Sequence, residues 1–154
     1  IIMKVAAFGE VLLRLATKKG VLISNTGELN VNYGGGETNV LVSLSNFGLE
    51  TRIITKISED SFGDGMLHYL RSKSIETKYV FRGEGRTPIY FLEVGSGNRN
   101  SKVIYDRKNS AFSSICEEDV VIEEVLKDVD IFHFSGITLA ISTTAFFRLS
   151  KILT

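Results

Sequence analysis

The 154-residue sequence predicts an α/β fold in which helices cover a mainly parallel sheet and a small β-sheet forms a lid. Strand-like apolar segments alternate with helix-like segments along most of the chain, and this order is typical of parallel sheets. β-rich runs joined by Gly-, Ser- and Asn-rich turns interrupt that alternation. The single cysteine cannot form an intrachain disulfide, so we expect a reducing, cytoplasmic setting.

The first third of the chain is expected to form a strand, a surface hairpin and a helix. The first strand is predicted at residues 4–8, and the alternating residues 10–15 are interpreted as its extension. The polar, glycine-containing residues 17–32 are typical of a hairpin or surface excursion. Beyond the three glycines 34–36, apolar residues fall on one helical face up to Gly48, which stands where a left-handed glycine ends a helix.

The middle of the chain is expected to add a strand, a helix and an antiparallel insertion. A strand is predicted at 52–57, and a polar loop at 58–65 precedes a helix that starts at Met66 and runs to about Lys73. The insertion then carries three β-rich runs, at 79–81, 89–94 and 102–105.

The last third is expected to close the α/β pattern. The acidic residues 117–119 favour a helix N-terminus and predict a helix that runs through Leu126. A buried strand at 131–135 leaves into a loop, and helical apolar spacing follows at 142–153. That spacing stops without a glycine cap or a returning strand, which indicates an N-terminal fragment, although a natural terminal helix has the same pattern.

These elements divide into two units. The main α/β unit is assigned to residues 1–16, 34–77 and 108–154, and the lid to residues 17–33 and 78–107.

Composition excludes several classes of function. The chain has 18 Lys and Arg against 18 Asp and Glu, with no basic run, so we expect no nucleic-acid partner. No window approaches the roughly 18 apolar residues of a membrane span, so we expect no membrane partner. The N-terminus also lacks the basic and apolar regions of a secretion signal.

Two groups of residues could carry ligand chemistry. Gly34, Gly35 and Gly36 before Asn39 allow a ligand to approach the backbone of a helix start, but a tight loop explains them equally well. They fit neither the G-x-G-x-x-G nor the Walker spacing. Strand alternation places Tyr105 and Arg107 on one face, suited to a carboxylate or a polyhydroxy ligand, while a solvated strand edge is the simpler interpretation. Tyr90 could stack on a sugar or pack within the lid.

Other reactive residues give weak signals. His68 and His133 lack metal-ligand spacing, and Cys116 has no activating partner, so we expect structural roles and no metal site of their own. Asp60 and Asp64 are typical of caps and turns. Glu10 is a single carboxylate, and the sequence shows no evident second carboxylate to act with it.

Five segments, taken in order, carry a resemblance to a known family. They are Phe8-Gly9-Glu10, Gly34-Gly35-Gly36-Glu37-Thr38-Asn39, Gly48-Leu49, Ser58-Glu59-Asp60-Ser61-Phe62-Gly63-Asp64 and Ser135-Gly136-Ile137-Thr138. In this order and at these intervals they resemble the N-terminal half of the ribokinase-like PfkB carbohydrate kinases. Within that family, Thr87-Pro88-Ile89-Tyr90-Phe91 and Tyr105-Asp106-Arg107-Lys108-Asn109-Ser110-Ala111 look most like the 2-keto-3-deoxygluconate kinases.

The resemblance implies a three-layer α/β/α domain whose lid covers the sugar and forms a homodimer contact. It implies that Gly35 and Asn39, with the backbone of Gly34 and Gly36, hold sugar oxygens. It also implies that Tyr90, Tyr105 and Arg107 contact a keto-deoxy sugar acid, with Arg107 facing its carboxylate. Arg14 stands where many family sugar kinases have Asp, which agrees with the sugar-acid branch.

The function implied is transfer of the ATP γ-phosphoryl group to a primary hydroxyl of 2-keto-3-deoxygluconate, with Mg²⁺. In the family the catalytic Asp of a G-A-G-D motif and most of the ATP site lie in a C-terminal half that this sequence does not contain. No catalytic residue is therefore assigned here, and this segment alone is expected to be inactive.

Three alternatives remain open. A kinase of the same family could act on fructose or another neutral sugar. The chain could be a non-catalytic sugar-binding or dimerisation module. A nicotinamide-binding Rossmann domain fits the alternation of elements but not the glycine spacing or the lid.

Overall fold

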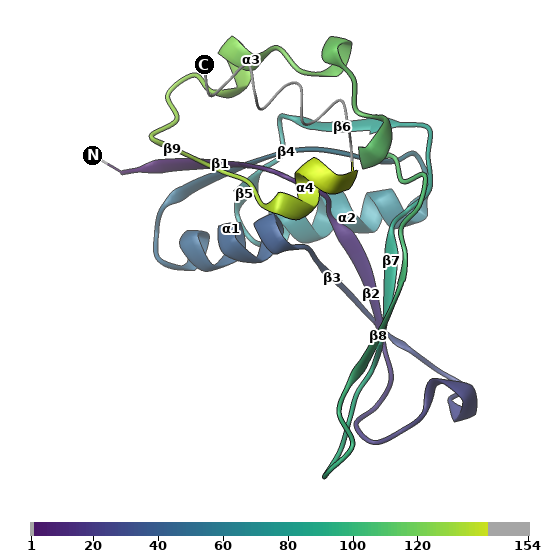
Figure 1. Ribbon diagram of the computed structural model, residues 1–154. Coiled ribbons are helices and arrows are strands. Elements are labelled where there is room, and N and C mark those ends of the chain that lie inside the picture. The colour runs from purple at the N-terminus through teal and green to yellow at the C-terminus, as the bar shows by residue number, and fades with distance from the viewer. Residues whose placement is uncertain (1, 142–154) are drawn as a thin grey trace.

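The computed structural model describes residues 2–141 and arranges them as two sheets (Figure 1). The larger sheet is parallel, with the order β5-β4-β1-β9 and with β6 paired to the second half of β4. Its strands are β1 (Lys4–Phe8), β4 (Glu50–Ser58), β5 (Ile75–Glu76), β6 (Val80–Gly83) and β9 (Ile131–His133).

Helical segments cover both faces of this sheet. The longer helices α1 (Gly36–Asn46) and α2 (Ser61–Ser72) lie on one face, and short helices lie on the other (Figure 1). The short ones are the 3-10 turns Phe112–Ser114 and Glu117–Asp119 and the helices α3 (Ile122–Val125) and α4 (Gly136–Ile141). The predicted three-layer α/β/α arrangement is confirmed. In the described part of the chain, no helix has the length and apolar character needed to cross a membrane.

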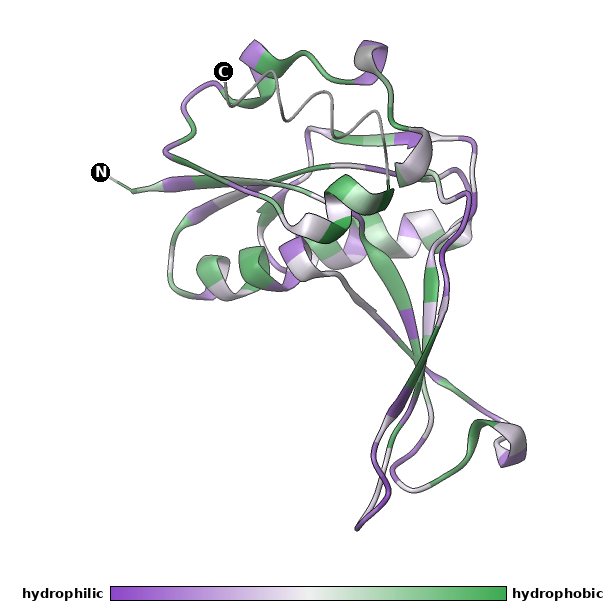
Figure 2. Cartoon of the chain, viewed as in Figure 1, coloured by the Kyte–Doolittle hydropathy of each residue, from purple (hydrophilic) through white to green (hydrophobic). Residues whose placement is uncertain are grey.

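Alternation along β1 explains how one strand serves two cores. Val5 and Ala7 pack in the cluster beneath α1 and α2, whereas Ala6 and Phe8 pack in the cluster beneath the 3-10 turns and α3. All four residues are at most 5% exposed, so both faces of the strand are buried. The apolar strands therefore run through the middle of the molecule, and polar residues gather on helix surfaces and loops (Figure 2).

The small sheet projects from the main body as a twisted ribbon (Figure 1). Its strands, in spatial order, are β3 (Asn30–Gly34), β2 (Leu12–Ala16), β7 (Ile89–Glu93) and β8 (Lys102–Asp106). The outer pairs are antiparallel and the central β2–β7 pair is parallel. The residues between β2 and β3, with a 3-10 turn at Ile23–Asn25, form the predicted surface hairpin.

The structure corrects the prediction that residues 10–15 extend the first strand. β1 ends at Phe8, and β2 belongs to the small sheet, so the lid takes strand residues from the segment assigned to the main unit as 1–16. The break lies at Glu10, whose buried carboxylate is held by residues outside both strands. Apolar alternation continues across this break because both β1 and β2 face a core. The periodicity of the sequence alone therefore does not separate the two strands.

The predicted antiparallel insertion at 78–107 is also wrong in part. Its first run becomes β6, which pairs in parallel with β4 in the main sheet. A turn closed by the Val80 N–H to the Thr77 carbonyl brings the chain back to that edge. Only β7 and β8 join the lid, where they pair antiparallel as expected.

Helix boundaries differ from the prediction at three places. α2 begins at Ser61 rather than Met66, because Asp60 caps it. The helix expected from 117 to 126 is interrupted at Val120 and Val121, which are extended and β-branched. α4 begins at Gly136, in the predicted loop, and the helix expected at 142–153 lies outside the described residues.

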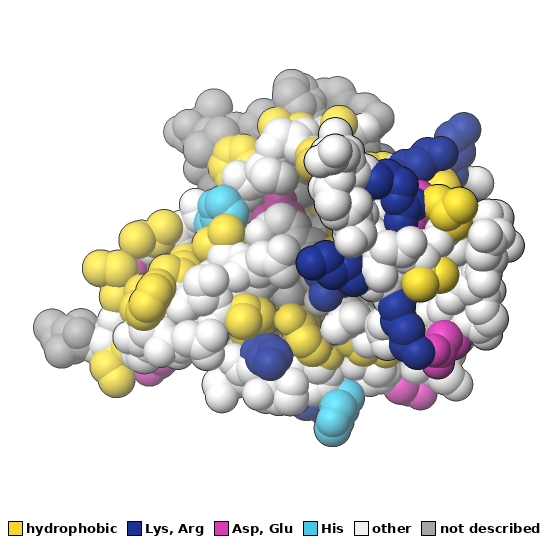
Figure 3. Space-filling view, turned by 90° about the horizontal axis from the view of Figure 1, so that it is seen from below, with side chains coloured by type: hydrophobic (Ala, Val, Ile, Leu, Met, Phe, Trp, Pro, Cys, Tyr) yellow, Lys and Arg dark blue, Asp and Glu magenta, His cyan; other side chains and the backbone are white. Residues whose placement is uncertain are grey.

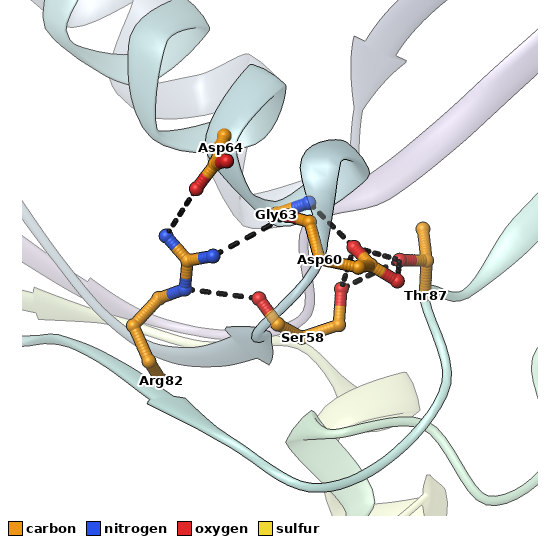
Figure 4. A network of polar contacts seen from close by, with 6 residues as sticks. All are labelled: Ser58, Asp60, Gly63, Asp64, Arg82 and Thr87. Carbon is orange, nitrogen blue, oxygen red and sulfur yellow. Dashed lines mark hydrogen bonds and ion pairs between the residues drawn. The ribbon is translucent and has the colours of Figure 1, made fainter.

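A polar network ties the base of the lid to the main sheet (Figure 4). The Asp60 carboxylate accepts hydrogen bonds from the Gly63 N–H at 3.0 Å and the Ser58 hydroxyl at 2.7 Å. The Ser58 hydroxyl also lies 2.6 Å from that of Thr87, two residues before β7 begins. Arg82 of β6 donates to the Ser58 carbonyl at 2.9 Å. The end of β4, the start of α2 and the entry to β7 are thus fixed to one another.

We expect the Asp60→Ala variant to unfold more easily, by about 1 kcal/mol, because the α2 cap is lost. Loss of hydration favours the neutral acid, but hydrogen bonds from the Gly63 N–H, the Ser58 hydroxyl and the Phe62 N–H outweigh it and lower the pKa of Asp60 below its ordinary 3.8. The ionised group therefore stabilises the fold above about pH 3.8, and this contribution is lost as the pH falls through the lower folded-state pKa.

Urea unfolding between pH 7 and pH 3 measures this effect. The Asp60→Asn variant keeps an acceptor for the cap but removes the charge. The difference between its free energy of unfolding and that of the parent should therefore shrink as the pH falls. A difference in unfolding free energy that stays constant between pH 7 and pH 3 would contradict the stabilising role of the ionised Asp60.

Candidate functional site

A cavity of about 160 Å³ lies where the start of α1, the small sheet and the turn between β9 and α4 meet. Pockets for drug-sized ligands span about 300–1,000 Å³, so this one suits a small molecule. Six of the seven predicted site residues line it, namely Gly35, Gly36, Asn39, Tyr90, Tyr105 and Arg107. Gly34 lies just behind, where an added Cβ would be 3.5 Å from the Asn39 side chain and 3.7 Å from the Tyr90 hydroxyl.

The glycines bring backbone to the cavity wall. Gly35 has φ of 137°, a conformation that side-chain-bearing residues rarely adopt, and an added Cβ would lie 2.5 Å from the Glu10 carbonyl oxygen. Because α1 starts at Gly36, the unpaired N–H groups of its first turn lie at this wall. A helix start of this kind offers hydrogen-bond donors to ligand oxygens.

Two tyrosines and an arginine form the opposite wall. Tyr90 on β7 and Tyr105 on β8 are directly paired, with ring centroids 6.0 Å apart. β8 ends at Asp106, so Arg107 lies past the strand and the predicted alternation does not place it. Its guanidinium nevertheless lies 5.6 Å from the centre of the Tyr105 ring, and the two side chains face the cavity together.

Glu10 is a site residue that the sequence interpretation missed. Arg107 donates to its Oε2 from Nε at 2.9 Å and from Nη2 at 2.5 Å, and the Ser110 hydroxyl donates to Oε1. The Glu10 side chain is 2% exposed. Burial raises the pKa of Glu10, although the hydrogen bonds from Ser110 and the charge of Arg107 oppose the rise. Arg107 is 97 positions away in sequence, so no local pattern could have shown this pair.

Glu37 is the second buried carboxylate at the site. It accepts hydrogen bonds from the Ser135 N–H at 2.9 Å and the Thr138 hydroxyl at 2.7 Å, and so fixes the turn between β9 and α4 against α1. A Cβ at Gly9 would lie 2.4 Å from the Glu37 side chain, which explains the glycine there. The two acids therefore belong to the frame of the cavity.

Comparison with known proteins identifies the family. The model of the pfkB family carbohydrate kinases matches residues 3–153. The chain belongs to this family. Its fold is therefore the ribokinase-like α/β fold, with the parallel sheet and the second, smaller sheet described above.

Several relatives of the PfkB family are similar over most of the chain. The crystal structure of a 2-dehydro-3-deoxygluconokinase from Thermotoga maritima is 40% identical, with a TM-score of 0.93, covering 97% of this chain and 46% of that one. A 2-dehydro-3-deoxygalactonokinase of Haloferax volcanii is 28% identical over 92% of this chain and 44% of its own length. A 2-dehydro-3-deoxygluconokinase of Thermoproteus tenax is 29% identical over 90% of this chain and 43% of its own length. This PfkB chain thus spans less than half the length of these relatives.

The other reactive side chains in the described part of the chain are dispersed. Among residues 2–141, no three His, Cys, Asp or Glu side chains cluster as a metal ion would require. Mg²⁺ in kinases is typically held by one or two carboxylates together with the phosphates of the nucleotide, so no residue of this part of the PfkB chain is assigned to that ion. Cys116 lies beside Asp119, and its hydrogen bonds to Glu118 and Asp119 raise the pKa of the thiol, so it is a poor nucleophile.

Arg14 has an unusual environment for a cation. Its register on β2 puts it on the same face as its neighbour Tyr90, which lines the cavity. Its Nε is buried without a hydrogen-bond partner among the described residues. A buried donor without a partner costs stability, so a function in ligand binding would explain why the arginine is present.

We expect Arg14→Met to raise the melting temperature of the protein by about 2–4 °C while weakening the binding of a ligand in the cavity. The methionine keeps much of the apolar stem but leaves no unpaired donor. Thermal unfolding and calorimetric titration measure the two effects. A lower melting temperature with unchanged binding would show that Arg14 is structural.

Proposed function

We propose that the protein containing this chain is a 2-keto-3-deoxygluconate kinase, which transfers the γ-phosphoryl group of ATP to a primary hydroxyl of the sugar acid. The observation that carries the proposal is the Arg107 guanidinium, held beside Tyr105 at a small cavity whose other wall is a glycine-rich helix start. Two of the relatives described above carry the name 2-dehydro-3-deoxygluconokinase, which is the same activity.

In this proposal each wall of the cavity has its own task. The planar fork of Arg107 binds the carboxylate of the sugar acid, and the hydroxyls of Tyr90 and Tyr105 bind neighbouring oxygens. Asn39 and the backbone at Gly34, Gly35 and Gly36 hold the hydroxyls at the other end. Basic side chains are more prominent than acidic ones on the face seen from the free end of the lid, which favours the approach of an anion (Figure 3).

The lid has two further roles in the proposal. Its tyrosine face closes over the sugar and keeps water from the transferred phosphoryl group. Its opposite face carries Val31 and Ile104, which are 57% and 42% exposed, and supplies a homodimer contact. Such exposed apolar side chains on a projecting sheet are typical of a protein contact.

ATP is the proposed phosphoryl donor, because the family is one of kinases. When bound, ATP would supply the γ-phosphoryl group, and Mg²⁺ would neutralise the charge of its phosphates. The catalytic base that accepts the sugar proton is not assigned to any residue of this chain.

A sugar panel tests the proposal with the whole gene product. We expect ATP-dependent phosphorylation of 2-keto-3-deoxygluconate at a kcat/KM about tenfold to a hundredfold above that for fructose or ribose, because a charged contact contributes about 1.5–3 kcal/mol. A preference for fructose would assign the chain to a neutral-sugar kinase. Sugar-acid binding without ATP turnover would favour a non-catalytic module.

A further inference from the structure

The charge of Arg107 is already paired within the chain. Its Nε and Nη2 each donate one hydrogen to the same oxygen of Glu10, which leaves the two hydrogens of Nη1 and the second hydrogen of Nη2 as the end of the fork that can bind a ligand. Both residues line the cavity, but the Arg107 side chain is 21% exposed and that of Glu10 only 2%, so the acid is the more deeply buried of the two. A carboxylate that binds Arg107 would therefore share the cation with Glu10.

The groups packed around Glu10 come from three further elements. Glu37 on α1 is a second carboxylate whose charge raises the pKa of Glu10, and the β9–α4 turn adds only the uncharged Ser135 and Thr138. Ser110 donates to Oε1 of Glu10 and itself accepts the Ser113 N–H at 3.2 Å. Among the described residues, Arg107 is the cation that pairs with Glu10.

We propose that Glu10 is the positioning residue for Arg107, and that Glu10 takes up a proton when the carboxylate of the substrate binds to Arg107. The inference rests on the function proposed above. With substrate bound, the carboxylates of Glu10 and the sugar acid would share the one cation Arg107, and the charge of Glu37 would act on Glu10 as well. Repulsion between like charges is strong beside the buried Glu10, and protonation of one acid relieves it.

Glu10 is the acid suited to accept that proton. Burial already raises its pKa, whereas the carboxylate of a 2-keto sugar acid is strongly acidic and stays ionised. The proton comes from the solvent and binds to Oε1. The O–H then donates to the Ser110 oxygen, whose own hydrogen can turn away. Oε2 continues to accept from Arg107, so the guanidinium keeps its position.

Calorimetric titration of the whole gene product with 2-keto-3-deoxygluconate, without ATP, tests this inference. At pH 7 the binding heat should depend linearly on the ionisation enthalpy of the buffer, with a slope that corresponds to uptake of between zero and one proton. Because a proton is taken up, affinity should fall as the pH rises, by at most about tenfold per pH unit.

Two variants separate positioning from general structural support. Glu10→Gln keeps the acceptor for Arg107 but cannot take up a proton, so it should bind the sugar acid with heats that do not depend on the buffer. Glu93→Gln is the matched control, because Glu93 is a largely buried acid that pairs with Arg99 in the lid at 2.8 Å. It should keep the buffer dependence of the parent.

The outcomes distinguish the inference from the function on which it rests. Binding with equal heats in all buffers and with affinity independent of pH would overturn the role of Glu10 alone. Buffer dependence that persists in Glu10→Gln would overturn it as well. If Glu10→Gln does not fold, the binding heats of the unaltered protein in different buffers and the pH dependence of its affinity still test the proton uptake. Absence of sugar-acid binding in the unaltered protein would overturn the proposed function, and the inference with it.

Discussion

Replacing Arg107 with lysine is expected to weaken binding of 2-keto-3-deoxygluconate by about tenfold to a hundredfold. Lysine keeps the positive charge but lacks the planar fork that donates to Glu10 from two nitrogens and also faces the cavity. Charge-assisted hydrogen bonds contribute about 1.5–3 kcal/mol, and each 1.4 kcal/mol is a factor of ten in affinity. Calorimetric titration of the whole gene product measures the loss.

The matched control for this prediction is Arg99→Lys. Arg99 also pairs with a largely buried acid, Glu93, but it lies in the lid away from the cavity. We expect this variant to bind the sugar acid as the parent does. Equal affinity of Arg107→Lys and the parent would contradict the assignment of Arg107 to the carboxylate.

The second large effect is expected at Gly35. An alanine there would have to adopt φ of 137° and would put its Cβ 2.5 Å from the Glu10 carbonyl oxygen, which is backbone and cannot turn aside. Strain and overpacking each cost about 1–3 kcal/mol, so we expect Gly35→Ala to lose about 2–4 kcal/mol of stability. Movement of the glycine wall should also abolish sugar binding, because that wall and Glu10 border the same cavity.

Gly27→Ala is the control for that substitution. An added Cβ at Gly27 meets no atom within 4 Å, and its φ is not in the left-handed region. We therefore expect its urea unfolding midpoint to match that of the parent. A Gly35→Ala protein as stable as the Gly27→Ala protein would show that the loop relaxes without loss.

Much of the fold was predictable because its signals are local. The helix after the three glycines ends as expected, with Gly48 at φ of 85°, and the order of alternating elements gave the parallel sheet. The errors arose where partners are distant. β6 joins β4 rather than the neighbouring lid strands, and β2 leaves the main sheet although apolar alternation continues from β1. Strand pairing of this kind is set by tertiary contacts that a single sequence does not display.

The site shows the same limit. Tyr90, Tyr105 and Arg107 could be proposed from their residue types and from the family resemblance, and the structure brings them to one cavity. Glu10 and Glu37 could not be proposed as site residues in this way, because their partners Arg107 and Thr138 lie 97 and 101 positions away in the sequence. A buried carboxylate is identified as functional only when its surroundings are known.

The most direct test of the sugar-acid site is a crystal structure of the whole gene product with 2-keto-3-deoxygluconate and without ATP. We predict that the sugar acid occupies the cavity between α1 and the small sheet, with its carboxylate on Arg107 and its hydroxyls on Asn39 and the glycine backbone. A sugar bound elsewhere, or one whose carboxylate points away from Arg107, would contradict this assignment.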